Sequence, residues 1–323
     1  MNLIPINQIT EDFENHLHSN SFSKSPENLY DPLHYFLSLG GKRIRPILVL
    51  VSHQLFEKEY SKSFPAATAI EYFHNFSLIH DDIMDEAILR RGEETVHKKW
   101  NTPIAILSGD VLLVHAYRQL SFLPTNCQLD CLKLFNQTAI EVCEGQQMDM
   151  DFERRTFVNA EEYIQMIKLK TSVLLACALQ MGAIIAGADL ENQHKLYQLG
   201  IEVGLSFQIH DDYLDLYNND PLFGKKRGGD LLQNKKTILS IKAVELIGEK
   251  EYLSFQERIN KLNEEEKILS YLTFFDKIGV KKEIENLQEN YNKSIFKTLN
   301  QIKTLHSKDN LNQLVSLILD RKH

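Results

Sequence analysis

The sequence predicts an all-α fold, and three observations support this prediction. Glycine and proline are scarce: 14 glycines and 8 prolines occur in 323 residues, whereas average usage of about 7% and 5% would give roughly 23 and 16. Proline, which interrupts helices most reliably, is absent between Pro124 and Pro221 and after Pro221. The chain also lacks short β-branched runs separated by hairpin turns. Long helices are therefore expected.

Prolines mark where several of these helices should begin. Pro46 and Pro65 each open an apolar segment, and proline is favoured in the first turn of a helix. Pro103 follows Thr102, which is a candidate N-cap. After Pro65, apolar residues recur every three or four positions, which is the period of a helix. The same spacing returns near the C-terminus over residues 311–318.

Charge, cysteine content and hydropathy limit the possible functions. The net charge of −8 argues against a nucleic-acid partner, which needs a basic face. The four cysteines lack zinc-site spacing, so we expect reduced thiols in the core and a cytoplasmic location. The longest apolar stretch, residues 174–188, is shorter than the roughly 18 to 20 residues of a membrane span. Without a Ser/Gly-rich linker, residues 1–323 are expected to form one domain.

One heptapeptide pattern occurs twice, as Ile-His-Asp-Asp-Ile-Met-Asp at residues 79–85 and as Ile-His-Asp-Asp-Tyr-Leu-Asp at residues 209–215. Residues four apart share a helix face, so each copy presents a pair of carboxylates in one direction. Such pairs are unfavourable unless a cation lies between them, and oxygen ligands of this kind suit Mg²⁺. The candidate metal-site residues are Asp81, Asp82, Asp85, Asp211, Asp212 and Asp215.

With these motifs, the chain resembles the trans-isoprenyl diphosphate synthases, the family of farnesyl and geranylgeranyl diphosphate synthases. The match runs from about Gly40 to Thr237. Its elements, in order, are Gly40-Gly41-Lys42-Arg43-Ile44-Arg45-Pro46, the first Asp motif with Arg90-Arg91-Gly92, Gly109-Asp110, Gly145-Gln146 with Asp149, Lys170-Thr171, Phe207-Gln208 before the second Asp motif, and Gly224-Lys225 through Gly229-Asp230 to Lys235-Lys236-Thr237. One departure is Asn234, where the family usually has glycine.

The resemblance implies a fold and a reaction. The fold is a single-domain bundle of long antiparallel helices around a deep central cavity, usually as a homodimer, with the two acidic helix faces opposite each other. The reaction is ionisation of an allylic diphosphate (dimethylallyl, geranyl or farnesyl) with the help of Mg²⁺, attack by isopentenyl diphosphate, and loss of a proton. It also implies that Asp81, Asp85 and Asp211 bind the metal directly, while Asp82, Asp212 and Asp215 hold waters or neighbouring side chains.

The resemblance further assigns two groups of substrate-binding residues. Lys42, Arg45, His74 and Arg91 match the residues that bind the diphosphate of isopentenyl diphosphate. Arg90, Lys170, Lys225 and Lys235 match those that hold the allylic diphosphate, with Thr171 and Gln208 beside the reacting carbon. The candidate catalytic residues are Arg90, Lys170, Thr171 and Gln208. A histidine on an apolar helix is more often a packed core residue. Core packing therefore remains an alternative to diphosphate binding for His74.

The residues before the first Asp motif bear on product length. Phe73, Phe76 and Ser77 share one helix face and are expected to line the wall along which the hydrocarbon grows. In the family, an aromatic residue five positions before the motif, followed by a small residue four positions before it, is typical of short-chain enzymes. Phe76 and Ser77 fit that pattern, which favours geranylgeranyl diphosphate over farnesyl diphosphate as the product.

Two alternatives remain. A class I terpene cyclase also uses an Asp-rich helix, but it usually has an Asn/Ser/Glu-type second motif and needs no counterpart of Lys42 and Arg45. A non-catalytic partner subunit would be expected to lack one of the two Asp motifs, and this chain retains both.

Overall fold

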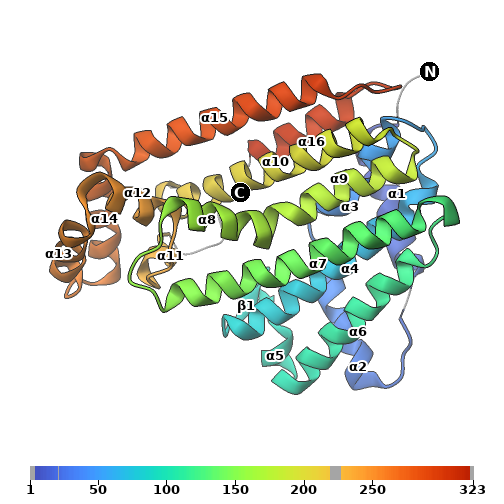
Figure 1. Cartoon of the computed structure of the whole chain (residues 1–323). Helices are drawn as coiled ribbons and strands as arrows, with labels where there is room; N and C mark the ends of the chain where they lie inside the picture. The colour runs from blue at the N-terminus through green and yellow to red at the C-terminus, as the bar shows by residue number, and fades with distance from the viewer. Residues whose placement is uncertain (1–3, 21, 219–226, 321–323) are drawn as a thin grey trace. The chain divides into compact units, whose positions relative to one another are not determined.

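The structure is a computed structural model, which describes residues 4–20, 22–218 and 227–320 (Figure 1). Apart from two short strands, the regular secondary structure of the described residues is helical, so the predicted all-α fold is confirmed. The chain divides into two compact units. Unit 1 comprises Met1–Asn136, Cys177–Tyr197 and Lys303–Leu314, and unit 2 comprises Gln137–Ala176, Gln198–Ile302 and Val315–His323. The expected single domain over residues 1–323 stays a prediction.

Unit 1 is built around one long helix, α4. This helix packs most extensively against α6 and also contacts α1, α3 and α5 (Figure 1). Of its apolar positions after Pro65, Ala66, Ala69, Ile70 and Phe73 are buried, as the helical spacing predicts, and Phe76 is partly buried. The helices of this unit are α1 (Ile6–Ser19), α2 (Glu27–Ser38), α3 (Ile44–Gln54), the 3₁₀ turn η1 (Ser61–Ser63), α4 (Phe64–Met84), α5 (Val96–Lys99) and α6 (Thr102–Leu120).

The helix starts follow the proline pattern with one correction. Pro65 lies in the first turn of α4, and Pro46 lies in the first turn of α3. The predicted cap at Thr102 is wrong, because Thr102 is already helical. The N-cap of α6 is Asn101, whose extended backbone lets its side-chain oxygen accept the backbone N–H of Ile104 at 2.9 Å.

A two-stranded antiparallel hairpin follows α4. Its strands are β1 (Leu89–Arg90) and β2 (Glu93–Glu94). The chain reverses at Arg91 and Gly92, whose φ angles are 56° and 84°, and such a pair of positive φ angles is typical of the tight turns that join hairpin strands.

Four helices contribute residues to both units: α7 (Thr125–Glu153), α9 (Val173–Ile185), α10 (Leu190–Tyr217) and α16 (Asp309–Leu319). Within unit 1, α9 approaches α3 closely at a glycine. A Cβ added at Gly182 would lie 2.1 Å from the carbonyl oxygen of Val49. Only glycine permits this approach of the two helices.

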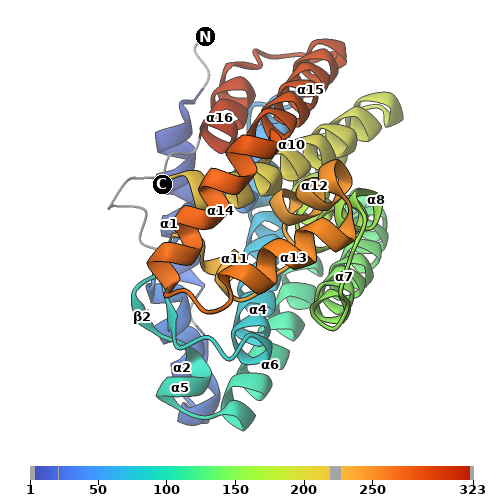
Figure 2. The ribbon, with the colours of Figure 1, turned by 90° about the vertical axis from the view of Figure 1, so that its left-hand side faces the viewer.

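The C-terminal helices of unit 2 gather around α12, which contacts α8, α13, α14 and α15. Figure 2 shows α12, α13 and α14 side by side. The helices of this unit are α8 (Ala160–Ile167), the π-helix η2 (Lys168–Ser172), α11 (Gly229–Leu232), α12 (Ile238–Ile247), α13 (Glu249–Ile259), α14 (Glu264–Ile278) and α15 (Val280–Gln301).

Within the described residues, one helix is long and apolar enough to cross a membrane, judged by length and composition. It runs over Ala160–Ile185, and 72% of its apolar window is buried. Buried core helices show the same composition. Of the four cysteines, Cys127, Cys131 and Cys177 are buried as expected, whereas Cys143 is exposed, which corrects its expected core position.

Candidate active site

The first Asp motif lies at the C-terminal end of α4. Asp81 and Asp82 stand in the last turn of the helix, and Asp85 follows its final residue. Asp82 is only 1% exposed, whereas Asp85 is exposed. The C-terminal end of a helix carries partial negative charge, which disfavours carboxylates there. The motif therefore depends on cationic partners.

Asp82 has such a partner in Arg90. The Nε of Arg90 donates to both carboxylate oxygens at 2.8 Å, and Nη2 lies 2.7 Å from Oδ1. Burial raises the pKa of Asp82 to about 6, although the charge and hydrogen bonds of Arg90 oppose this shift. Both oxygens of Asp82 are engaged by the arginine of strand β1. The second aspartate of the motif thus fixes a basic residue of the predicted site.

Arg91 points to another part of unit 1. Its Nη1 donates to the carbonyl oxygen of Gly40. A Cβ added at Gly41 would lie 3.2 Å from Nη2 of Arg91, so this glycine leaves room for the guanidinium group. The hairpin turn therefore separates two neighbouring arginines, with Arg90 directed to the Asp motif and Arg91 to the loop before Lys42.

The segment that carries Lys42 and Arg45 is fixed by a buried ion pair. Arg43 is 6% exposed and stands just before α3 with a left-handed backbone, φ 48°. Its Nη1 lies 2.6 Å from Oε1 of Glu71 on α4, and its Nε lies 2.8 Å from Oε1 of Glu14 on α1. Arg43 thus links the start of α3 to α1 and α4, next to Lys42 and close to Arg45.

His74 lies beside Arg45. The Nη1 of Arg45 is 3.2 Å from Nε2 of His74, and a guanidinium group only donates, so His74 accepts at Nε2 and carries its proton on Nδ1. Burial, and then the charges of Arg45, Arg91, Arg90 and Arg43, hold the pKa of His74 well below its usual range. A neutral His74 therefore orients Arg45, which is more than a packing role.

The three predicted chain-length residues differ in accessibility. Phe73 is 1% exposed, and its ring contacts those of Phe76 and Phe135, with centroids 5.6 and 5.3 Å away. Phe76 and Ser77 are only partly buried. The hydroxyl of Ser77 donates to the carbonyl oxygen of His74 at 2.8 Å. Phe73 thus supports the ring of Phe76, while Phe76 and Ser77 keep accessible surface.

The second Asp motif lies in the last two turns of α10, which ends at Tyr217. Asp212 and Asp215 are buried, and Asp211 is partly buried. The Oδ2 of Asp215 accepts the backbone N–H of Asp230 at 3.3 Å. This contact ties the start of the segment that carries Lys235 to the motif.

Asp212 accepts three hydrogen bonds within unit 2. Its Oδ2 accepts from the hydroxyl of Tyr163 at 2.6 Å and from the backbone N–H of Ile238 at 2.9 Å, and its Oδ1 accepts from Nε2 of Gln208 at 3.3 Å. Burial raises the pKa of Asp212 to about 7 despite these donors. Asp212, like Asp82 in the first motif, is thus buried and holds neighbouring protein groups in place.

Lys170 and Thr171 lie on the π-helix η2, which continues α8. A Cβ added at Gly145 would lie 2.2 Å from the backbone nitrogen of Lys170, so α7 can approach this turn only at a glycine. The Nζ of Lys170 lies 2.6 Å from Oδ2 of Asp149, and the hydroxyl of Thr171 donates to Oε1 of Gln208 at 3.5 Å. Single π-turns in helices are frequent at functional sites.

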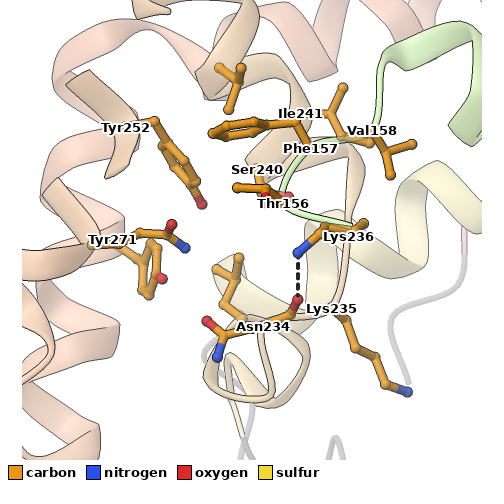
Figure 3. Close-up of a pocket in the computed structure, with 13 residues that line it drawn as sticks. Thr156, Phe157, Val158, Asn234, Lys235, Lys236, Ser240, Ile241, Tyr252 and Tyr271 are labelled. Carbon is orange, nitrogen blue, oxygen red and sulfur yellow. Dashed lines mark hydrogen bonds between the residues drawn. The ribbon is translucent and has the colours of Figure 1, made fainter. Parts of the chain in front are cut away.

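Lys235 lies in a tight loop. Asn234 has φ 57°, a left-handed conformation that asparagine tolerates better than most residues, so it can replace the glycine usual in the family. The backbone N–H of Lys235 donates to the carbonyl oxygen of Asp230 at 2.9 Å. Figure 3 shows Lys236 turned toward the carbonyl oxygen of Asn234, beside the pocket lined by Tyr252 and others, while the ammonium group of Lys235 is directed away. The side chains of these neighbouring lysines thus point in different directions.

The predicted residues fall into two groups. Unit 1 contains Lys42, Arg45, Phe73, His74, Phe76, Ser77, Asp81, Asp82, Asp85, Arg90 and Arg91, and unit 2 contains Lys170, Thr171, Gln208, Asp211, Asp212, Asp215 and Lys235. Lys225 lies outside the described residues.

The donor chemistry of the motifs fits a hard cation. In the part of the chain that the structure describes, no three His, Cys, Asp or Glu side chains gather to hold an ion by themselves. Mg²⁺ characteristically binds through one or two carboxylates together with substrate phosphates. Asp81, Asp85 and Asp211 could supply such carboxylates.

Comparison with known proteins defines the family. A family model described as polyprenyl synthetase matches residues 26–273. The chain belongs to the polyprenyl synthetase family. It is 42% identical to the geranylgeranyl pyrophosphate synthase of Geoglobus acetivorans over 69% of this chain and 70% of that protein. It is 40% identical to the geranylfarnesyl diphosphate synthase of Natronomonas pharaonis over 68% and 70%. A crystal structure of geranylgeranyl pyrophosphate synthase superposes with a TM-score of 0.90 at 42% identity and full coverage of both chains.

Sequence reasoning missed two supporting residues, Glu71 and Tyr163. Glu71 is 2% exposed in the apolar part of α4, and a charged residue at such a position signals a buried partner. Tyr163 carries no comparable signal, because the sequence does not distinguish a tyrosine that donates to a buried carboxylate from one that packs in the core.

Replacing Glu71 tests the buried support of the Lys42–Arg45 segment. We expect Glu71→Gln to lower the free energy of unfolding by about 3 kcal/mol, because removing one partner of a buried pair leaves the Arg43 charge poorly compensated. Lys62→Met is the matched control, since it breaks the exposed Lys62–Glu57 pair at a cost of less than about 1 kcal/mol. Denaturant unfolding measures both, and equal losses would contradict a special role for the Arg43–Glu71 pair.

Proposed function

We propose that the chain is a trans-prenyltransferase that condenses isopentenyl diphosphate with allylic diphosphates to a short all-trans prenyl diphosphate. The observation that carries the proposal is the pair of Asp motifs at the ends of α4 and α10, each with a buried second aspartate that holds another predicted site residue, Arg90 or Gln208. Family membership and the names of the relatives support the same reaction.

The proposed cofactor is Mg²⁺, bound by Asp81, Asp85 and Asp211. When bound, it neutralises negative charge on the departing diphosphate, which lowers the barrier to carbon–oxygen ionisation. Asp82, Asp212 and Asp215 support the motifs from within. Asp82, Asp212 and Asp215 accept hydrogen bonds from Arg90, Tyr163 and the backbone of Asp230, so we assign these three aspartates to the metal site indirectly.

The basic residues divide between the two substrates. We assign Arg90, Lys170, Lys225 and Lys235 to the allylic diphosphate, and Lys42, Arg45, His74 and Arg91 to isopentenyl diphosphate. Arginine and lysine stabilise the charge that develops on the leaving group. The oxygens of Thr171 and Gln208 are oriented by their mutual hydrogen bond and by Asp212, and they would stabilise the allylic cation without being alkylated as readily as a carboxylate.

Turnover is the direct test. The purified protein is incubated with Mg²⁺, isopentenyl diphosphate and, in turn, dimethylallyl, geranyl and farnesyl diphosphate, and the products are identified by mass. Prenyl diphosphates extended by five-carbon units support the proposal. A cyclic hydrocarbon formed from a single diphosphate would identify a terpene cyclase, and no turnover with any primer would favour a non-catalytic subunit.

The metal ligands give the first variant test. Asp81→Ala and Asp211→Ala should each lower kcat by about 10³-fold or more, because several kcal/mol of charge stabilisation is lost. Asp130→Ala, on the exposed face of α7, is the control and should retain full turnover. Circular dichroism checks that the helices persist, and normal activity of either motif variant would count against the mechanism.

Product length gives the second test. The proposed product is geranylgeranyl diphosphate ahead of farnesyl diphosphate, because Phe76 and Ser77 fit the family's pattern for short-chain enzymes. Both residues keep accessible surface beside the buried Phe73. Ser77→Phe adds a ring on the same helix face and should shift the products toward farnesyl diphosphate. Ser77→Ala, which removes only the hydroxyl bond to His74, should leave the product unchanged. An unaltered distribution in Ser77→Phe would refute this assignment.

We also propose a cytoplasmic homodimer with no stable membrane span and no nucleic-acid partner. Unit 1 exposes large apolar side chains on α6 and α7, including Leu107, Val114, Tyr117 and Leu129. Such a surface is typical of a protein contact. Sedimentation equilibrium should give twice the 37.4 kDa chain mass, and a monomer at micromolar concentration would contradict the dimer.

A further inference from the structure

The loop that carries Lys235 is attached to the second Asp motif at both of its ends. On its N-terminal side, in the short helix α11, the backbone N–H of Asp230 donates to Oδ2 of Asp215 at 3.3 Å. At its end, the backbone N–H of Ile238, the first residue of α12, donates to Oδ2 of Asp212 at 2.9 Å. Two carboxylates of one helix therefore set where this loop begins and ends.

The same Oδ2 of Asp212 receives the hydroxyl of Tyr163 at 2.6 Å. Tyr163 lies on α8 and is 2% exposed. Short O–H···O⁻ bonds of this length are among the stronger hydrogen bonds in proteins. Because Oδ2 is shared, the tyrosine hydroxyl orients the oxygen that holds the N-terminus of α12.

Tyr163 is itself held in place. The helix α8 begins with a capping box, in which the Asn159 side chain accepts the N–H of Glu162 and the Glu162 side chain accepts the N–H of Asn159. Arg155 adds a two-point contact to Glu162 at 2.8 and 3.0 Å. At its other end, α8 continues directly into η2, which carries Lys170. The tyrosine is therefore fixed on the element that leads to that lysine.

Three segments thus converge on one buried carboxylate: α8 with η2, the loop before α12, and α10 itself through Gln208. We propose that Tyr163 is a positioning residue, whose hydroxyl orients Asp212 and through it the Lys235 loop and Gln208. The inference rests on the proposed function, because it concerns the geometry of the site for the allylic diphosphate.

The variant Tyr163→Phe removes one oxygen atom and tests this inference. The chain offers a matched control in Tyr60→Phe, because the hydroxyl of the buried Tyr60 also donates to an aspartate, Asp12, at 2.6 Å, in the N-terminal part of unit 1. We expect Tyr163→Phe to raise KM for the allylic diphosphate about tenfold. Loss of a residue that orients a directly binding group typically lowers affinity by about this factor or more. KM for isopentenyl diphosphate should stay within about twofold, and Tyr60→Phe should change neither constant.

Hydrogen–deuterium exchange gives a readout that does not require turnover. Peptides covering residues 231–240 should exchange at least about fivefold faster in Tyr163→Phe than in the native protein or in Tyr60→Phe. In an Asp212→Asn background, adding Tyr163→Phe should cause no further increase, because the tyrosine acts through that carboxylate.

The outcomes separate the two proposals. A native protein without turnover refutes the proposed function, whatever the exchange data show. An active native protein whose Tyr163→Phe variant keeps native KM values and native exchange refutes the positioning role. Equal increases of both KM values, together with a lower melting temperature than that of Tyr60→Phe, would show that Tyr163 supports only the fold.

Discussion

Six aspartates crowd the C-terminal ends of two helices, and the rest of the site depends on how their charges are balanced. Like charges oppose one another, and the end of a helix that carries partial negative charge opposes them further. In each motif, the second aspartate is buried and hydrogen-bonded, Asp82 to Arg90 and Asp212 to Tyr163. The negative charge of the other four aspartates must be balanced by cations. We infer that such cations allow an acidic protein of net charge −8 to bind an anionic substrate.

This division gives each motif two tasks. Asp82 holds the hairpin that presents Arg90, and Asp212 and Asp215 hold the loop that presents Lys235. The aspartates that face inward therefore place cationic side chains, while Asp81, Asp85 and Asp211 are proposed to bind metal. Each helix end thereby provides both proposed metal ligands and the support for cationic groups that we assign to the substrates.

Much of the fold could be predicted from the sequence, because helical periodicity and proline placement are local. The segment after Pro65 became α4, whereas Asp85, expected on the helix face of Asp81, follows the last residue of that helix. The π-turn at Lys170 could not be predicted, because it accompanies the close approach of Gly145, a tertiary contact. Tyr163 was missed for a similar reason. Its partner, Asp212, lies 49 residues away, and nothing near Tyr163 in the sequence marks it.

We propose that the acidic motifs bind the substrate diphosphate only through divalent ions. Calorimetric titration with an allylic thiodiphosphate, which resists ionisation, measures this directly in the presence of Mg²⁺ and again with the metal removed by chelation. We expect an affinity at least about 100-fold tighter with Mg²⁺, equivalent to about 2.7 kcal/mol. Equal affinity under the two conditions would contradict it.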